Sequence, residues 1–139
     1  MSSMSPSDTK AGFTAIETAD APAAIGPYSQ AVAVNGLLFV SGQLPIDPAT
    51  GDFVSEDPVE QARQCLRNVA AIARAAGTDI ARTVQTTVLV RDLKRFPEIN
   101  AAYAEFFSAP YPARATFEVS GLPKNAQVEI EAVVALGKD

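Results

Sequence analysis

Alternating side chains mark residues 28–34 as a strand, and the nearly all-apolar run from Leu37 to Ser41 marks a second one. Asn35-Gly36 lies between them, and Asn-Gly is the strongest short-range signal for a tight hairpin turn. Because the second run is almost entirely apolar, we expect it to be buried on both faces. Residues 45–52 then carry the Pro, Asp and Gly that are typical of turns.

A helix is predicted to begin at Asp57. Asp57 can cap it, Pro58 suits its first turn, and Glu60 would complete a capping box. Gly77 is placed to end the helix in the left-handed conformation. Between these ends, apolar residues recur at helical spacing along one stripe, which comprises Ala62, Cys65, Leu66, Val69, Ile72, Ala73 and Ala76.

A third strand and a second helix follow. Asp92 can cap a helix that extends to about Phe107. The strand is predicted over residues 82–91, with one face formed by Val84, Thr86, Val88 and Val90. The inner face of the helix is predicted to comprise Phe96, Ile99, Tyr103 and Phe106.

Two strands close the chain. In the second of them, Glu129 and Glu131 lie opposite an apolar set, Val128, Ile130, Ala132, Val134 and Leu136. In the first, one face is formed by Arg114, Thr116 and Glu118, and the other by Ala115, Phe117 and Val119. This succession of strands and helices predicts an α+β fold, a mixed β-sheet with two helices packed on one face. The other face of the sheet needs cover, which self-association would provide.

Length and composition point to one folded unit. The chain has 139 residues, 47% of them hydrophobic and 19% charged, which predicts a single globular domain over residues 13–139. Residues 1–12 show no periodicity, so we expect a flexible N-terminal arm. No apolar run approaches the roughly 20 residues that cross a bilayer, and the N-terminus lacks the apolar segment of a secretion signal. We therefore expect a soluble, cytoplasmic protein with no membrane partner.

Charge and missing residue types narrow the chemistry. Eleven Lys and Arg against sixteen Asp and Glu give a net charge of −5, which argues against binding to a nucleic-acid backbone. The sequence has no histidine, which excludes a His-based triad, a His general base and His ligation of a metal. Its one cysteine, Cys65, excludes an intramolecular disulfide and a Cys-rich zinc site.

Three charged residues could carry chemistry. Arg114 follows Pro110-Tyr111-Pro112, and it is either an exposed residue at the start of a strand or a guanidinium fork suited to bidentate capture of a small carboxylate. Glu129 and Glu131 lie on one face of a strand, roughly 7 Å apart. They form either a solvated polar face or a pair of acid and base. Spacing alone does not decide between these interpretations.

Four other residues also have two interpretations each, and a fifth, Phe96, shares a helix face with one of them. Tyr28 follows a Gly-Pro turn and either packs or places a phenol at the mouth of the sheet. Gly42 marks a bulge or a point where a ligand approaches the backbone. Phe96 and Asn100 share a helix face, so Asn100 is a core-edge amide or a polar handle in an apolar pocket. Cys65 lies on the apolar helix stripe, which favours a buried structural thiol over a nucleophile.

Several linked motifs resemble the reactive-intermediate deaminase family, the RidA or YjgF-type enamine/imine deaminases. The most specific are APAAIGPYSQA at 21–31, FVSGQLPIDPATG at 39–51 and PARATFEVSGLPKNAQVEIEAVV at 112–134. Between them, QARQCLRNVAAIARAAG and TTVLVRDLKRFPEINAAY are similar to the family's helix, strand and second helix, in order. The resemblance covers residues 14 to 136, almost the whole chain.

The resemblance implies a homotrimer with a chorismate-mutase-like fold and three sites at the subunit interfaces. Members hydrolyse small 2-imino and 2-enamino acids to 2-keto acids and ammonia, with no metal and no organic cofactor. By resemblance, Arg114 binds the substrate carboxylate, Glu129 handles the attacking water and Glu131 is structural. The family's pocket-lining positions fall on Tyr28, Gly42, Phe96 and Asn100, and backbone groups near Thr116 and Gly42 would bind the imino nitrogen.

One departure from the family lies at Thr116, where many members carry cysteine. This puts redox regulation in doubt more than deamination, and it is also compatible with a different substrate. The alternatives that remain are a trimer that binds small keto or amino acids without turnover, an endoribonuclease, and a deaminase of a related catabolic substrate. Net charge disfavours the ribonuclease, although Arg91, Lys94 and Arg95 could form a local basic patch.

Overall fold

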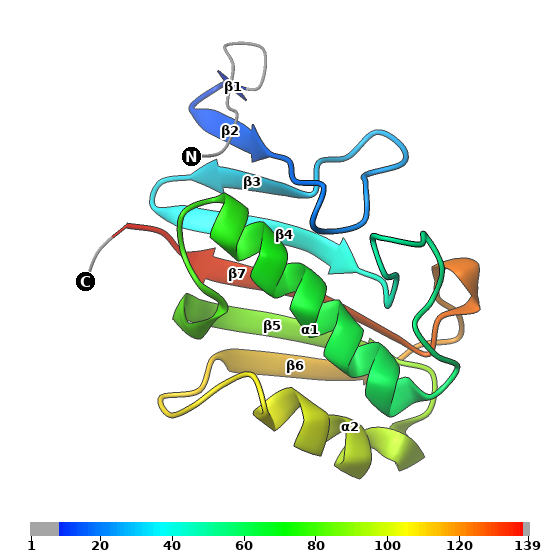
Figure 1. Cartoon of the computed structure of the whole chain (residues 1–139). Coiled ribbons are helices and arrows are strands. Elements are labelled where there is room, and N and C mark those ends of the chain that lie inside the picture. Colours follow the sequence, from blue (N-terminus) through cyan, green and yellow to red (C-terminus); the bar gives the residue numbers. More distant parts are fainter. Residues whose placement is uncertain (1–8, 138–139) are drawn as a thin grey trace.

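A seven-stranded mixed sheet with strand order β1-β2-β3-β4-β7-β5-β6 forms the frame of the molecule (Figure 1). The computed structural model describes residues 9–137. All neighbouring strands are antiparallel except β5 and β6, which are parallel. The strands are β1 (Thr9–Lys10), β2 (Phe13–Ile16), β3 (Ala31–Val34), β4 (Leu37–Gln43), β5 (Thr83–Val90), β6 (Ala113–Glu118) and β7 (Val128–Ala135).

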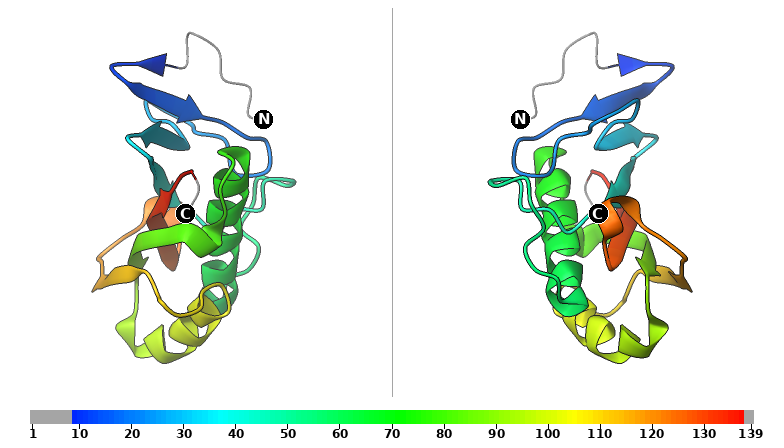
Figure 2. Two further views of the ribbon diagram at one scale, coloured as in Figure 1. Left: turned by 90° about the vertical axis from the view of Figure 1, so that its left-hand side faces the viewer. Right: turned by 90° about the vertical axis from the view of Figure 1, so that its right-hand side faces the viewer.

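Two α-helices, α1 (Pro58–Ala75) and α2 (Phe96–Ala104), pack on one face of this sheet, as the side views in Figure 2 show. Three short 3₁₀ turns, η2 (Ile80–Arg82), η3 (Leu93–Arg95) and η4 (Pro123–Asn125), join the elements. The predicted α+β architecture, a mixed sheet with both helices on one side, is confirmed. No helix within residues 9–137 is long and apolar enough to cross a membrane.

The predicted hairpin forms as β3 and β4. Asn35 and Gly36 both have positive φ, +50° and +78°, as a type I′ turn requires, and Val34 pairs with Leu37 across it. Strand β3 begins at Ala31 rather than at Tyr28, because residues 26–28 form a turn in which the Tyr28 amide donates to the Gly26 carbonyl. Tyr28 therefore lies in a loop that leads into the sheet.

The long helix α1 contributes to both halves of the core. Six of its seven predicted stripe residues are buried and the seventh, Ala76, is partly buried. One end of the helix packs with β3, β4 and β7, and the other packs with β5, β7 and α2. Gly77 ends it at φ +85°, where the Thr78 amide donates to the Ala73 carbonyl, as predicted.

The helix start predicted at Asp57 and Pro58 is confirmed, but the predicted side-chain caps are wrong at both helices. Asp57 occupies the N-cap position of α1, but its side chain accepts from Arg95 at 3.2 Å instead of from the helix backbone, and Glu60 binds Arg63. A guanidinium is a stronger partner for a carboxylate than a backbone amide is, so the charged contact wins. Asp92 caps the 3₁₀ turn η3 through the Lys94 amide, and α2 itself ends at Ala104 rather than near Phe107.

One burial prediction and one assignment of a strand face are also wrong. Phe39 is 42% exposed because it points away from the helices, so β4 is covered on one face only within this chain. Val84 is exposed and Thr83 is buried, because a register shift against β7 between Thr83 and Gln85 reverses the alternation there. From Thr86 to Val90, the predicted alternation of β5 holds.

The N-terminal arm predicted over residues 1–12 differs from the structure in part. Thr9 and Lys10 form β1, which pairs with β2. The remaining residues of that prediction that precede Thr9 lie outside the described part of the chain.

Buried amides fix the loops around the sheet. Gln30 is 4% exposed, and its side chain bonds the Thr18 amide and the carbonyls of Thr18, Ala21 and Pro22. Asn68 of α1 donates to the carbonyls of Leu44 and Ile46, both at 3.0 Å. Because a buried amide is costly unless its hydrogen bonds are made, these contacts hold the segments that flank β3 and β4 in one arrangement.

Candidate functional site

Arg114 lies on β6, the edge strand, on the face that α2 covers. Its Nη1 donates to Asn100 Oδ1 at 2.7 Å. Its guanidinium carbon stands 5.2 Å from the centre of the Phe96 ring and 4.8 Å from that of Tyr103. The guanidinium thus has a defined position, although the residue is exposed and makes no ion pair within residues 9–137.

A pocket of about 670 Å³ lies elsewhere on the molecule, around Glu129 of β7. Apolar side chains form most of its wall, and its polar groups include Tyr28, Lys124, Glu129 and Glu131. Its lining residues come from the loop before β3, from β4 and the loop after it, from η4 and from β7: Pro22, Ala23, Ile25, Tyr28, Gln30, Ser41, Gly42, Gln43, Leu44, Ile46, Pro123, Lys124, Glu129 and Glu131.

Gly42 gives the Glu129 carboxylate its place in this pocket. A Cβ added at Gly42 would collide with Glu129 Oε2 and lie 3.0 Å from its Cδ. The backbone φ of Gly42 is not one that only glycine adopts, so space and not conformation requires glycine here. The bulge predicted at Gly42 is confirmed, since the pairing of β4 with β7 is irregular between Val40 and Gln43, and the group that approaches its backbone is the protein's own glutamate.

Burial raises the pKa of Glu129 above its ordinary value of 4.5, and repulsion from Glu131 raises it further. Glu131 is two residues away on the same strand face, as the sequence predicted. No cation within the described chain pairs with Glu129. A half-buried carboxylate of this kind is suited to accept and return a proton.

Strand register places Arg114 and Glu129 on opposite faces of the sheet. Arg114 pairs with Thr86 of β5, whose hydroxyl meets Tyr103 of α2, so both side chains point towards the helices. Glu129 pairs with Leu89, which is an odd number of residues from Thr86 along β5 and therefore faces the other side of the sheet. The residues on either side of Glu129, Val128 and Ile130, belong to the core beneath the helices. Glu129 therefore points away from the helices. One chain carries both groups without bringing them together.

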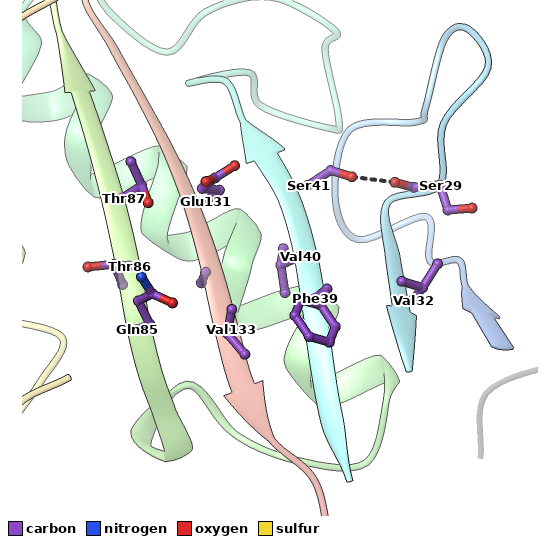
Figure 3. A pocket seen from close by; sticks show the side chains of 11 residues that line it. Ser29, Val32, Phe39, Val40, Ser41, Gln85, Thr86, Thr87, Glu131 and Val133 are labelled. Carbon is purple, nitrogen blue, oxygen red and sulfur yellow. Dashed lines mark hydrogen bonds between the residues drawn. The ribbon is translucent and has the colours of Figure 1, made fainter. Parts of the chain in front are cut away.

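The helix-free face of the sheet also carries a shallow groove of about 300 Å³ next to the Glu129 pocket. Figure 3 shows it from that face, with Phe39, Gln85, Thr87, Glu131 and Val133 drawn along β4, β5 and β7. The Ser41 hydroxyl donates to the Ser29 carbonyl at 2.6 Å on one side of it. Glu131 contributes to both the groove and the pocket.

The predicted site residues thus fall into two clusters. Arg114, Phe96 and Asn100 form one, and Thr116 shares their sheet face on β6. Tyr28, Gly42 and Glu129 form the other. Sequence reasoning gave Tyr103 only a core role and missed Lys124. The i, i+4, i+7 spacing of Phe96, Asn100 and Tyr103 on one helix could have indicated that Tyr103 belongs to the site. No feature of the sequence indicated Lys124.

Two other chemical possibilities can be placed as well. Cys65 is fully buried with its Sγ 3.6 Å from the Val128 carbonyl, and burial raises the pKa of its thiol well above the ordinary range, which agrees with a structural thiol. Within residues 9–137, no cluster of three or more His, Cys, Asp or Glu side chains could hold a metal ion.

Comparison with known proteins identifies the family. The model of the family described as Endoribonuclease L-PSP matches residues 18–136. The chain belongs to this family. It is a protein of the RidA/YjgF type, and the resemblance inferred from its motifs is confirmed.

Similar proteins carry different names. The RutC family protein y4sK of Sinorhizobium fredii is 67% identical over 121 residues, which cover 87% of this chain and 96% of that protein. The 2-iminobutanoate/2-iminopropanoate deaminase of Homo sapiens is 47% identical over 88% of this chain and 89% of its own length. The crystal structure of E. coli TdcF with bound serine is 40% identical, with a TM-score of 0.84 over 89% of this chain and 99% of that one.

Substitution of Gly42 tests the close contact with Glu129. We expect Gly42→Ala to fold, because the displaced atoms end a flexible side chain, but to move the carboxylate and lower any activity that depends on it by about tenfold or more. Gly121→Ala is the matched control, since a Cβ there meets nothing within 4 Å. Comparable activity in the two variants, measured beside their melting curves, would contradict this assignment.

Proposed function

We propose that this protein hydrolyses small 2-imino and 2-enamino acids, such as 2-iminobutanoate and 2-iminopropanoate, to 2-keto acids and ammonia. The observation that carries the proposal is the Arg114 guanidinium, which is held in place by two aromatic rings and an amide while most of its N–H groups have no protein partner in the described chain. That arrangement suits bidentate capture of a carboxylate. Relatives named as imine deaminases support the chemistry.

We infer that two copies of the chain share each site. Arg114 and Glu129 lie on opposite faces of one sheet, so a single substrate can meet both only if they come from different chains. A homotrimer with a chorismate-mutase-like arrangement would provide three such sites and would cover the exposed Phe39 and Phe117 on the helix-free side. The Arg114 cluster of one copy would then face the Glu129 pocket of its neighbour.

In this site, Arg114 would fix the substrate carboxylate and hold C2 in one orientation. Glu129 would take a proton from a water molecule as its oxygen attacks C2 of the imine, which breaks the C=N π bond and gives a carbinolamine. The same carboxyl group would return the proton to nitrogen. Glu129 would then take the proton of the new hydroxyl group and pass it to the nitrogen, so that ammonia leaves as the C–N bond breaks and the 2-keto C=O bond forms. Backbone groups near Gly42 and Thr116, which the family resemblance assigns to the imino nitrogen, would bind it. No redox step and no co-reactant other than water is needed.

Arg114 and Glu129 are expected to act on different steps. Arg114→Ala should lose substrate binding and lower kcat/KM for 2-iminobutanoate by about 10²-fold, because the orienting contact is gone. Glu129→Gln should still bind 2-oxobutanoate but lower kcat by about 10²-fold, because the base is gone. The imine is generated in situ and its hydrolysis is measured above the background rate in buffer. Arg67→Ala, an exposed arginine on α1, is the control.

The same assay separates the alternatives. An intact protein that binds 2-oxobutanoate but gives no rate above background would be a ligand-binding protein, and the proposal would fail. A ribonuclease activity would fall steeply with salt and would survive Arg114→Ala. The basic patch considered for it is partly neutralised, since Arg95 pairs with Asp57 and Glu98.

The rate should depend on pH through Glu129. Its raised pKa means that the carboxylate, and with it kcat/KM, is lost as pH falls through a value above 4.5. Glu131→Gln removes the repulsion between the two glutamates, so the acid limb should move to lower pH, although burial still holds it above 4.5. Glu17→Gln, at an exposed site on the chain, should leave the limb unchanged. An acid limb that does not move in Glu131→Gln would contradict this role for Glu129.

A further inference from the structure

Arg114 is held by aromatic rings and an amide oxygen instead of by a carboxylate. Its guanidinium carbon lies 5.2 Å from the Phe96 ring centre and 4.8 Å from the Tyr103 ring centre, and it makes no ion pair with the described residues. A guanidinium carries five N–H donors. Only one hydrogen bond, from Nη1 to Asn100, is made within residues 9–137.

This choice of partners matters for a residue that binds carboxylates. A protein carboxylate would occupy the fork that the ligand must use. The face of an aromatic ring attracts the cation through its quadrupole and leaves the in-plane N–H groups unoccupied. Rings therefore restrain the guanidinium without competing with a ligand for its donors.

All three contacts come from one stripe of α2. Phe96, Asn100 and Tyr103 are spaced i, i+4 and i+7, so they lie above one another on the helix face that meets β6. Because β6 is the edge strand, no further strand covers Arg114 on its outer side. The helix stripe is therefore the surface that determines where the guanidinium lies.

Tyr103 is the anchored member of the stripe. It is 5% exposed, and its phenol oxygen lies 2.7 Å from Thr86 Oγ1 in a buried hydrogen bond. Its ring packs against Phe107 with 4.8 Å between centres and an interplanar angle of 43°. Thr86 is also the register partner of Arg114 on the neighbouring strand. Thr86, Tyr103 and Arg114 therefore contact or pair with one another: Thr86 of β5 holds the Tyr103 ring, and that ring contacts Arg114 of β6.

We propose that Tyr103, fixed by Thr86, is a positioning residue that orients the Arg114 guanidinium for carboxylate binding, with Phe96 as the second ring. The inference rests on the proposed function for the identity of the ligand. Neither Tyr103 nor Thr86 touches the ligand. Both act through Arg114, and their loss should weaken carboxylate binding more than it lowers the rate of the bound substrate.

The first test is the affinity for 2-oxobutanoate, measured by calorimetry on the full chain. Tyr103→Leu removes the ring and should weaken binding about tenfold, whereas Tyr103→Phe keeps the ring and should weaken it only about threefold. Thr86→Val removes the same hydrogen bond and should match Tyr103→Phe, with no further loss when the two are combined. Phe107→Leu is the control, since it removes core packing behind Tyr103 but no ring over Arg114; it should lower the melting temperature and keep the affinity.

The second test reads Arg114 directly. Ring currents from Phe96 and Tyr103 should shift the Nε–Hε NMR resonance of Arg114, which is identified by its absence in Arg114→Lys. We expect Tyr103→Phe to retain that shift and Tyr103→Leu to lose a large part of it. An unchanged resonance or wild-type affinity in folded Tyr103→Leu would overturn the proposal. If Tyr103→Leu does not fold, wild-type affinity in both Tyr103→Phe and Thr86→Val would overturn it.

These readouts are independent of turnover. An intact protein without deaminase activity would overturn the proposed function, whereas the position of the Arg114 resonance would still decide the role of Tyr103. Conversely, full deaminase activity combined with an Arg114 resonance that stays unchanged in Tyr103→Leu would overturn only the positioning role of Tyr103.

Discussion

The alternation of side chains across β5, β6 and β7 is the constraint on which the functional account depends. Register along β5 places Arg114 opposite Thr86 and Glu129 opposite Leu89, and this odd separation directs the two side chains to opposite faces. A one-residue slip of either strand would reverse that relation. In β7, the core residues Val128 and Ile130 prevent such a slip, because it would expose them and bury the two glutamates. The packing of the core and the division of the site therefore have the same origin.

Each half of the site carries a charge that has no ion-pair partner among residues 9–137 of its own chain. Arg114 is restrained by ring faces and an amide oxygen, and Glu129 lies over Gly42 with burial and Glu131 acting to raise its pKa. A charge without an ion-pair partner gives up stability that a structural salt bridge could supply, and it is free to interact with a ligand. The proposed function requires a second copy of the chain, so that Arg114 of one copy and Glu129 of its neighbour contact the same substrate.

Local patterns in the sequence predicted the elements well where one physical effect dominates. The Asn35-Gly36 hairpin, the apolar stripe of α1 and the alternation of β7 were all predicted and are confirmed. The predicted capping box was wrong because Arg95, which comes from a distant segment of the chain, binds the Asp57 carboxylate in place of the helix backbone. The strand face predicted for Val84 was wrong because the bulge in the pairing of β5 with β7 cannot be recognised from the sequence of β5 alone.

The site was predictable residue by residue but not as an arrangement. The faces of β6 and of β7 could each be separated by alternation, yet β6 has no buried face that would indicate its orientation. Its orientation depends on parallel pairing with β5, which local sequence does not encode. The same limit applies to Tyr103: its core placement followed from helical spacing, whereas its contact with Arg114 required the helix to be placed beside the edge strand.

The most direct test of the shared site is complementation between two inactive variants. Arg114→Ala and Glu129→Gln are unfolded together, mixed in equal amounts and refolded, and hydrolysis of 2-iminobutanoate is compared with that of each variant refolded alone. With random assembly, about one quarter of the shared sites would hold an intact arginine from one copy and an intact glutamate from its neighbour, so about a quarter of wild-type activity should return. Mixed oligomers that remain as inactive as the separate variants would contradict the account.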